Sequence, residues 1–260
     1  MMNYKEHFSL CRGLWSGTEK LNINDFYDDP ARVVPTDSFG EDYEASIWSA
    51  AVKVFAYFSR NNREGIMLKY PDIWSLKDEL ETICSYLVPH LEETMYGCHL
   101  YVDKVYVYRT TKCERDSSYI WHYDNNPDVI VKNIIYLNDV TDDNSPFEYL
   151  SKPDGRGHMF KAFRIGPNEW KNAPNGSRVN KEVESLIDKG YNPTKVIGSQ
   201  GTTFTFNNNT AHRANPIKEG YRDVINIRVK PTMNRISFLS KEHTSSFEAQ
   251  GVVDPDPEKK

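Results

Sequence analysis

Apolar residues recur at helical spacing in two stretches of the first hundred residues, which predicts two amphipathic helices. The first helix is expected over residues 41–60. The second is expected from Ser75 as N-cap, with Asp78 at the capping-box position, and Pro89 should kink or end it. Residues 1–40 are expected to be irregular. The expected apolar stripes are Ile47, Trp48, Ala51, Val52, Phe55 and Phe58 in the first helix and Leu76, Leu80, Ile83, Leu87 and Leu91 in the second.

From residue 99 the pattern changes to short runs rich in β-branched and aromatic residues, which are typical of strands. Turn-forming residues separate these runs, and within residues 202–206 the stretch from Thr203 alternates strictly between polar and apolar side chains. Short strands joined by such turns predict an all-β sandwich or barrel. Strands are expected over residues 100–102, 104–108, 120–124, 129–140, 158–165, 195–197, 202–206 and 222–230.

No linker or repeat divides the chain, so a single domain over residues 1–260 is expected. An insertion at residues 166–193, with one short helix near 180–189, has the loop composition of a lid over a site. The expected parts are an irregular and helical flank (1–97), a β core (98–235) and a frayed C-terminal extension (236–260).

Charge and cysteine content narrow the functional classes. A net charge of −5 disfavours broad nucleic-acid or anionic-membrane binding, which requires a basic face. Cys11, Cys84, Cys98 and Cys113 form no CxxC pair and no zinc-spaced cluster, which favours free thiols in a reducing compartment. Neither a signal-peptide core nor an apolar membrane span is apparent. We therefore expect a cytoplasmic protein.

A polar pair lies at the end of one expected strand. His122 and Asp124 are two residues apart, so their side chains point to one face of a strand. An imidazole and a carboxylate placed in this way can be two of the three ligands of a non-haem iron(II). His212 is the expected third ligand, because it follows a strand and precedes Arg222 by ten residues. His158 is the main alternative, but no arginine follows it at the matching distance.

Two neutral imidazoles and one carboxylate leave iron(II) with three open positions and a positive charge, which favours binding of an α-keto acid. Arg222 opens the next strand and can make two parallel hydrogen bonds to the distal carboxylate of that acid. Arg228 competes with Arg222 for this role from the same strand.

The residues HYDNNP at 122–127, the distant His212 and then Arg222 together resemble the Fe(II)/2-oxoglutarate-dependent dioxygenases. HYDNNP followed by IYLN at 135–138 is similar to the HxDNP and YYLN pattern of prolyl-hydroxylase-like members. The resemblance covers about residues 100–232.

A second branch of the superfamily shows a further likeness. The residues IYLNDV at 135–140, NSPFEYL at 144–150 and GYR at 220–222 are similar to phytanoyl-CoA-dioxygenase-like members. Ser145 departs from that branch, because a glycine is usual before the Pro-Phe pair.

The resemblance implies a mainly β fold, a double-stranded β-helix (jelly roll or cupin-like barrel) with flanking N-terminal α-helices. It implies that His122, Asp124 and His212 are the metal ligands and catalytic residues, holding Fe(II). Arg222 would hold the C5 carboxylate of 2-oxoglutarate.

Further cosubstrate contacts are implied by the same resemblance. Tyr136 matches a tyrosine that hydrogen-bonds 2-oxoglutarate in prolyl-hydroxylase-like members, and Tyr108 matches a second one. Lys132 competes with both, because it shares a face with Tyr136. The alternative for Tyr136 is barrel filling, the usual role of interior aromatic residues.

The expected activity is that of an oxygenase that hydroxylates a small molecule, consumes O2 and 2-oxoglutarate, and releases succinate and CO2. Ascorbate is a candidate stimulant. The retained Asp124 favours hydroxylation over halogenation, because halogenating relatives replace this residue with a small one. Two alternatives stay open: a cupin-type metal enzyme that does not use 2-oxoglutarate, and a jelly-roll binding module with a vestigial metal site. The specificity elements are expected in the N-terminal helices, residues 113–118 and residues 166–193, while the substrate and oligomeric state are not readable.

Overall fold

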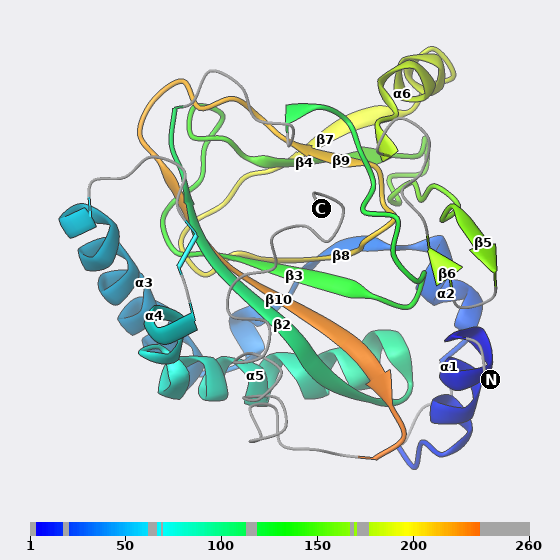
Figure 1. Ribbon diagram of the computed structural model, residues 1–260, viewed down its shortest axis with the longest axis horizontal. Helices are drawn as coiled ribbons and strands as arrows, with labels where there is room; N and C mark the ends of the chain where they lie inside the picture. The colour runs from blue at the N-terminus through cyan, green and yellow to red at the C-terminus, as the bar shows by residue number, and fades with distance from the viewer. Residues whose placement is uncertain are drawn as a thin grey trace.

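Two antiparallel β-sheets face each other in the computed structural model, and helices cover the outer face of the larger sheet (Figure 1). The structure describes residues 4–17, 21–61, 67–68, 70–112, 119–166, 169–170 and 177–234. The expected C-terminal extension (236–260) and the predicted specificity loop 113–118 therefore lie outside the described residues.

The larger sheet has five strands in the order β1-β8-β3-β10-β2, all neighbours being antiparallel. Its two longest strands confirm the expected runs near residues 100–108 and 222–230, although the first two runs form one strand with an irregularity opposite Arg228 and Val229. The strands are β1 (Ala31–Val34), β2 (His99–Thr110), β3 (Val131–Tyr136), β8 (Thr203–Asn207) and β10 (Arg222–Thr232).

The smaller sheet has three strands in the order β7-β4-β9. The predicted strand over residues 120–124 is not a regular strand; among these residues His122 alone forms bridges, to His212 and to Arg178. The predicted strand over 158–165 is likewise reduced to a bridge at Met159 and a short hairpin strand. The remaining strands are β4 (Phe147–Ser151), β5 (Arg164–Gly166), β6 (Glu169–Trp170), β7 (Asn192–Val196) and β9 (His212–Ala214).

The N-terminal flank is more ordered than the sequence pattern predicts. Residues 1–40 were expected to be irregular, but they contain two helices and β1, which extends the larger sheet beside β8. Short elements of this kind carry too few periodic positions to be recognised locally. The helices are α1 (Tyr4–Gly13), α2 (Ile23–Asp28), α3 (Glu41–Asn61), α4 (Tyr70–Trp74), α5 (Lys77–Leu91) and α6 (Asn180–Ile187), with a 3₁₀ turn (Thr36–Ser38) and a π-helical turn (Glu92–Tyr96).

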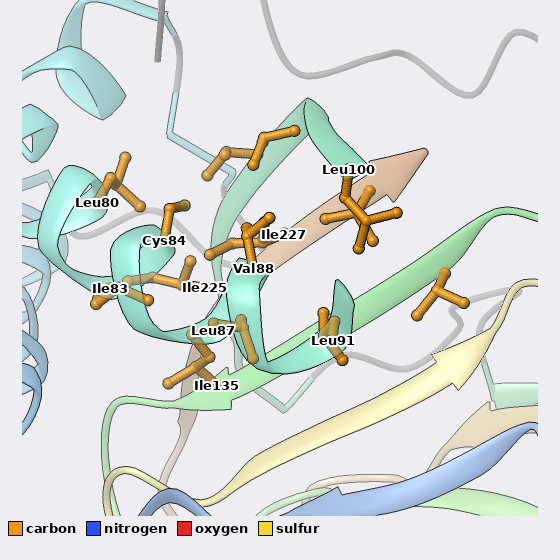
Figure 2. Packing of buried hydrophobic residues seen from close by; sticks show 14 of the residues in the cluster. Leu80, Ile83, Cys84, Leu87, Val88, Leu91, Leu100, Ile135, Ile225 and Ile227 are labelled. Atoms are coloured by element: carbon orange, nitrogen blue, oxygen red, sulfur yellow. The ribbon is translucent and has the colours of Figure 1, made fainter. Parts of the chain in front are cut away.

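Helix α5 packs its predicted apolar stripe on the outer face of the larger sheet (Figure 2). Every expected member of that stripe is buried, and Ile83 and Leu87 are fully enclosed. Each such side chain contributes about 1.5–3 kcal/mol through burial. The helix ends at Leu91, just after Pro89. The predicted N-cap is wrong, because the Ser75 hydroxyl donates to the carbonyl of Asp72 (2.6 Å) and Leu76 is the cap residue.

Helix α3 has the predicted bounds but a different buried face. Trp48, Val52 and Phe55 are exposed, although the sequence pattern placed them in the apolar stripe. Six apolar positions cover a wider arc of the helix than one neighbouring helix can bury. The buried face is Tyr43, Ile47, Ala50, Val54 and Phe58.

The two sheets enclose a second, aromatic core in the barrel interior. Alternate residues of β2 separate the two cores: Val105 and Val107 are buried toward the helices, whereas Tyr106 and Tyr108 are half-buried on the inner side. The interior cluster is Ala31, Ile134, Tyr136, Val140, Phe147, Val196, Phe204, Phe206 and Val224, with Tyr108 and Tyr149 packed against it.

In the described part of the chain, no helix is long and apolar enough to span a bilayer.

Candidate metal centre

The structure brings together His122, Asp124 and His212. One donor atom from each lies within 4.8 Å of the others. His122 and His212 form a bridge in which each backbone N–H donates to the other's carbonyl (3.0 and 2.9 Å). Directly opposite residues of such a pair point to the same face, which brings both rings together, with centroids 4.3 Å apart. Two residues further on, the Asp124 N–H donates to the carbonyl of Asn208 (2.9 Å).

Both imidazoles are held with a free lone pair toward the centre. The Nδ1 atom of His122 lies 2.8 Å from the carbonyl of Ile120, and that of His212 lies 2.8 Å from the carbonyl of Thr210. A carbonyl can only accept, so Nδ1 donates in each ring and Nε2 is left as a potential ligand atom. Burial lowers the pKa of His122 to about 3 and also lowers the pKa of His212, so both rings are neutral near pH 7.

Asp124 supplies the negative charge of the group. Burial, the largest single cause, raises the pKa of its carboxyl group, but Lys132, His212 and His122 together lower it more, so the pKa lies well below its ordinary value. The Lys132 Nζ atom donates to Asp124 Oδ2 at 2.7 Å. The same oxygen lies 4.0 Å from Nε2 of His212. The predicted competitor for cosubstrate binding is therefore in direct contact with a candidate metal ligand.

A buried asparagine-rich turn holds the segment after Asp124. Asn209 accepts from the Asn126 N–H through Oδ1 (3.2 Å) and donates from Nδ2 to the Asn126 carbonyl (2.8 Å). Asn125 has a positive φ of 49°, a conformation that asparagine tolerates better than most residues. These contacts fix the backbone that follows the carboxylate.

Arg222 lies in the barrel wall and is almost fully buried, with 3% of its surface exposed. Its guanidinium donates to the carbonyl of Ser145 and to the hydroxyl of Thr110 (3.4 Å). Its Nε atom has no hydrogen-bond partner, and no carboxylate among the described residues forms an ion pair with it. A buried guanidinium without a counter-charge is costly unless an anion binds there.

Ser145 adopts a left-handed conformation with φ of 66°. This backbone geometry explains why a glycine is usual at this position, since glycine adopts positive φ without steric cost. It also directs the Ser145 carbonyl toward Arg222. The Ser145 side chain is buried and its hydroxyl has no partner.

Tyr136 lies beside Arg222 in the barrel interior. Its hydroxyl donates to the carbonyl of Val196 (2.8 Å), accepts from the Phe147 N–H (3.2 Å), and interacts with Arg222. The Phe147 ring stacks on His212 with centroids 5.3 Å apart. Tyr108 packs against the same interior cluster. Both tyrosines thus belong to the barrel interior, where Arg222 interacts with Tyr136.

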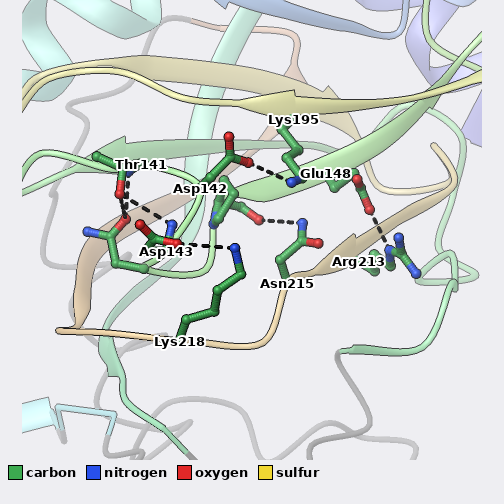
Figure 3. Close-up of polar contacts among 10 residues, drawn as sticks. Thr141, Asp142, Asp143, Glu148, Lys195, Arg213, Asn215 and Lys218 are labelled. Carbon is green, nitrogen blue, oxygen red and sulfur yellow. Dashed lines mark hydrogen bonds and ion pairs between the residues drawn. The ribbon is translucent and has the colours of Figure 1, made fainter.

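Polar contacts tie the loop that contains Ser145 to β7 and to the segment after β9 (Figure 3). Lys195 of β7 pairs with Asp142 (2.5 Å), and Lys218 pairs with Asp143 (3.1 Å). Arg213, which follows His212 on β9, pairs with the buried Glu148 of β4. These contacts hold the loop against β7 and the His212 strand against β4.

Two of the competing residues, Arg228 and His158, have other partners. Arg228 makes a two-pronged contact with Asp103 (2.8 and 2.6 Å), so its charge already has a partner. His158 packs edge-on against Phe160 and Tyr191 and does not join the triad. The sequence pattern did not indicate that Thr110 accepts a hydrogen bond from Arg222 or that Lys132 pairs with Asp124. In the sequence, Ser145 in place of the usual glycine was the local signal of the geometry around Arg222.

No protein-family model matches the chain, and no curated protein matches its sequence. Several solved structures are similar in fold. HygX from Streptomyces hygroscopicus, with nickel and 2-oxoglutarate bound, has 17% identity and a TM-score of 0.51, covering 83% of this chain and 88% of that chain. The non-heme α-ketoglutarate-dependent carbocyclase SnoK from nogalamycin biosynthesis has 14% identity and a TM-score of 0.51 (83% and 85%). EctD from S. alaskensis, in its apoform, has 15% identity and a TM-score of 0.53 (84% and 82%).

At these identities the likeness concerns the fold. It confirms the predicted mainly β jelly roll with N-terminal helices. It also agrees with the resemblance seen in the sequence, without selecting one of its two branches. The chain therefore has the jelly-roll fold of solved 2-oxoglutarate-dependent non-heme enzymes, with a His-Asp-His group inside it.

Proposed function

We propose that this protein is an Fe(II)- and 2-oxoglutarate-dependent oxygenase that hydroxylates a small molecule. The observation that carries the proposal is the buried Arg222, without a carboxylate partner among the described residues, in the same barrel as the His-Asp-His group. The His-Asp-His group fits a metal ion, and Arg222 fits an organic anion. HygX, which shares the fold, was solved with nickel and 2-oxoglutarate bound.

The donor set fits iron(II). His122 and His212 would bind it through Nε2, because both Nδ1 atoms are engaged by backbone carbonyls. Asp124 would add the carboxylate, which completes two imidazoles and one carboxylate and leaves positions open for a cosubstrate. Lys132 would orient this carboxylate from the side, as outer partners of metal ligands commonly do.

Arg222 would hold the distal carboxylate of 2-oxoglutarate through charge-assisted hydrogen bonds. Its unpartnered Nε is the group left available for that contact. The Tyr136 hydroxyl, beside Arg222, would either add a hydrogen bond or position the guanidinium. Tyr108 and the interior aromatic cluster would exclude water from the space between Arg222 and the triad.

When bound, iron and 2-oxoglutarate would supply the oxidising chemistry, with O2 consumed and succinate and CO2 released. The chain's own residues bind, orient and enclose these groups. The retained Asp124 favours hydroxylation over halogenation. SnoK is described as a carbocyclase, so the oxidation catalysed on this fold is not confined to hydroxylation.

Sequential calorimetric titrations with Mn(II) and then 2-oxoglutarate test the proposal. An oxygenase binds both ligands, whereas a cupin-type enzyme that uses no keto acid binds the metal alone and a binding module with a vestigial site binds neither. Succinate release with Fe(II), ascorbate and 2-oxoglutarate should then be abolished in His122→Ala and His212→Ala. The matched control His158→Ala should retain it, and full release by His122→Ala would refute the assignment.

A further inference from the structure

Arg178 lies beside the candidate metal centre on a segment that directly precedes α6. It forms an antiparallel bridge with His122. Two backbone hydrogen bonds flank this bridge, from Tyr123 N–H to the Ser177 carbonyl (3.3 Å) and from Val179 N–H to the Trp121 carbonyl (2.9 Å). Residues 177–179 therefore run as a short extra strand along residues 121–123.

The pairing determines the direction of the Arg178 side chain. Directly opposite residues in an antiparallel pair project to the same face. Arg178 therefore points to the side of His122 and Asp124, where His212 lies. The other face of this pairing carries apolar side chains, with the Arg213 guanidinium over the Trp121 ring (4.5 Å to its centroid). These apolar residues are Trp121, Tyr123, Leu150, Val179, Val183 and Ala211.

Two observations place the guanidinium close to the metal ligands and available for binding. After burial, which is the largest cause, the charge of Arg178 also contributes to the lowered pKa of both His122 and His212. The side chain is half-buried. Among the described residues, no carboxylate pairs with Arg178, in contrast to Arg213 on the other side of the sheet, which pairs with Glu148.

The charges around the centre leave room for a second anion. Arg178, Lys132 and Arg222 are cations, and Asp124, the carboxylate of the triad, pairs with Lys132. A divalent metal adds two positive charges, and the 2-oxoglutarate dianion offsets two. The excess positive charge therefore remains after the cosubstrate has bound.

We propose that Arg178 binds an oxyanion, such as a carboxylate, on the prime substrate and so holds the substrate beside the metal. The inference rests on the proposed function and names its substrate class as small organic anions. A guanidinium suits this role because its planar N–H groups match an oxyanion with two parallel hydrogen bonds. Arg178 also lies within residues 166–193, which the sequence pattern marked as a specificity element.

The test uses trifluoroacetate as the anion probe and trifluoroethanol as its neutral counterpart. Each is titrated into the protein loaded with Mn(II) and 2-oxoglutarate, and fluorine NMR records the line broadening that the paramagnetic metal causes in nearby nuclei. Wild-type protein should broaden the trifluoroacetate signal saturably, with little effect on trifluoroethanol. Acetate should reverse the effect, and acetamide should not.

Arg178→Met should weaken apparent trifluoroacetate binding by about tenfold or more, because charge-assisted hydrogen bonds are lost. Arg178→Lys should retain an intermediate effect, and the exposed-arginine control Arg156→Met should match the wild type. Unchanged broadening in Arg178→Met, or equal broadening of both probes by the wild type, would overturn the inference. Calorimetry of 2-oxoglutarate on each variant verifies the fold of the site. Failure of the wild type to bind 2-oxoglutarate would instead overturn the proposed function.

Discussion

Replacing Arg222 by methionine is expected to stabilise the metal-free protein and to weaken 2-oxoglutarate binding. The two effects have one origin, the burial of a cation that has no carboxylate partner among the described residues. A buried donor without a partner costs about 1–3 kcal/mol, and the hydrogen bond to Ser145 that the variant loses offsets part of the gain. A net gain of about 1–2 kcal/mol is expected, which raises Tm by about 2–6 °C.

The loss in binding follows from the same charge. Truncating one partner of a buried charge pair costs about 2–5 kcal/mol, so Arg222→Met should weaken 2-oxoglutarate binding by roughly 30-fold to several thousand-fold. Calorimetric titration of the Mn(II)-loaded protein measures this change, and thermal unfolding of the metal-free protein measures the stability.

Arg228→Met is the matched control, because it lies on the same strand and the same face as Arg222. Arg228 is paired with the buried Asp103, so its removal should destabilise the protein by about 3 kcal/mol and leave 2-oxoglutarate affinity unchanged. Unaltered 2-oxoglutarate affinity in Arg222→Met, or destabilisation as large as that of Arg228→Met, would refute the reasoning.

Three further predictions follow from single contacts. Ser145→Gly should raise the free energy of unfolding by about 1 kcal/mol, because it relieves the positive φ and removes a buried, unpartnered hydroxyl; equal denaturation midpoints would contradict this. Lys132→Met should lower the Tm of the metal-free protein, since Asp124 loses its partner, but less so with Mn(II) bound; equal losses in both states would indicate a purely structural role. Asn209→Ala should weaken Mn(II) binding by about tenfold in calorimetry without removing a ligand, and unchanged affinity would show that the Asn126 segment needs no such support.

Local periodicity in the sequence was sufficient to predict the side-chain directions of several residues in this protein. The two-residue spacing of His122 and Asp124 places both side chains on one face wherever the backbone is extended, even though the segment is not a regular strand. The apolar stripe of α5 was readable for the same reason, since a helix repeats every 3.6 residues whatever it packs against. Side-chain direction along one element depends on that element alone.

The choice between equivalent residues was decided by tertiary structure. Arg222 and Arg228 share a strand and a face, but Asp103 on the neighbouring strand forms its ion pair with Arg228. In α3, the exposure of Trp48 and Phe55 depends on where neighbouring elements lie. Arg178 carries no periodic signal at all, because its position beside His122 results from pairing between distant segments. Contacts between elements depend on the register in which distant segments pair, and a short stretch of sequence does not specify that register.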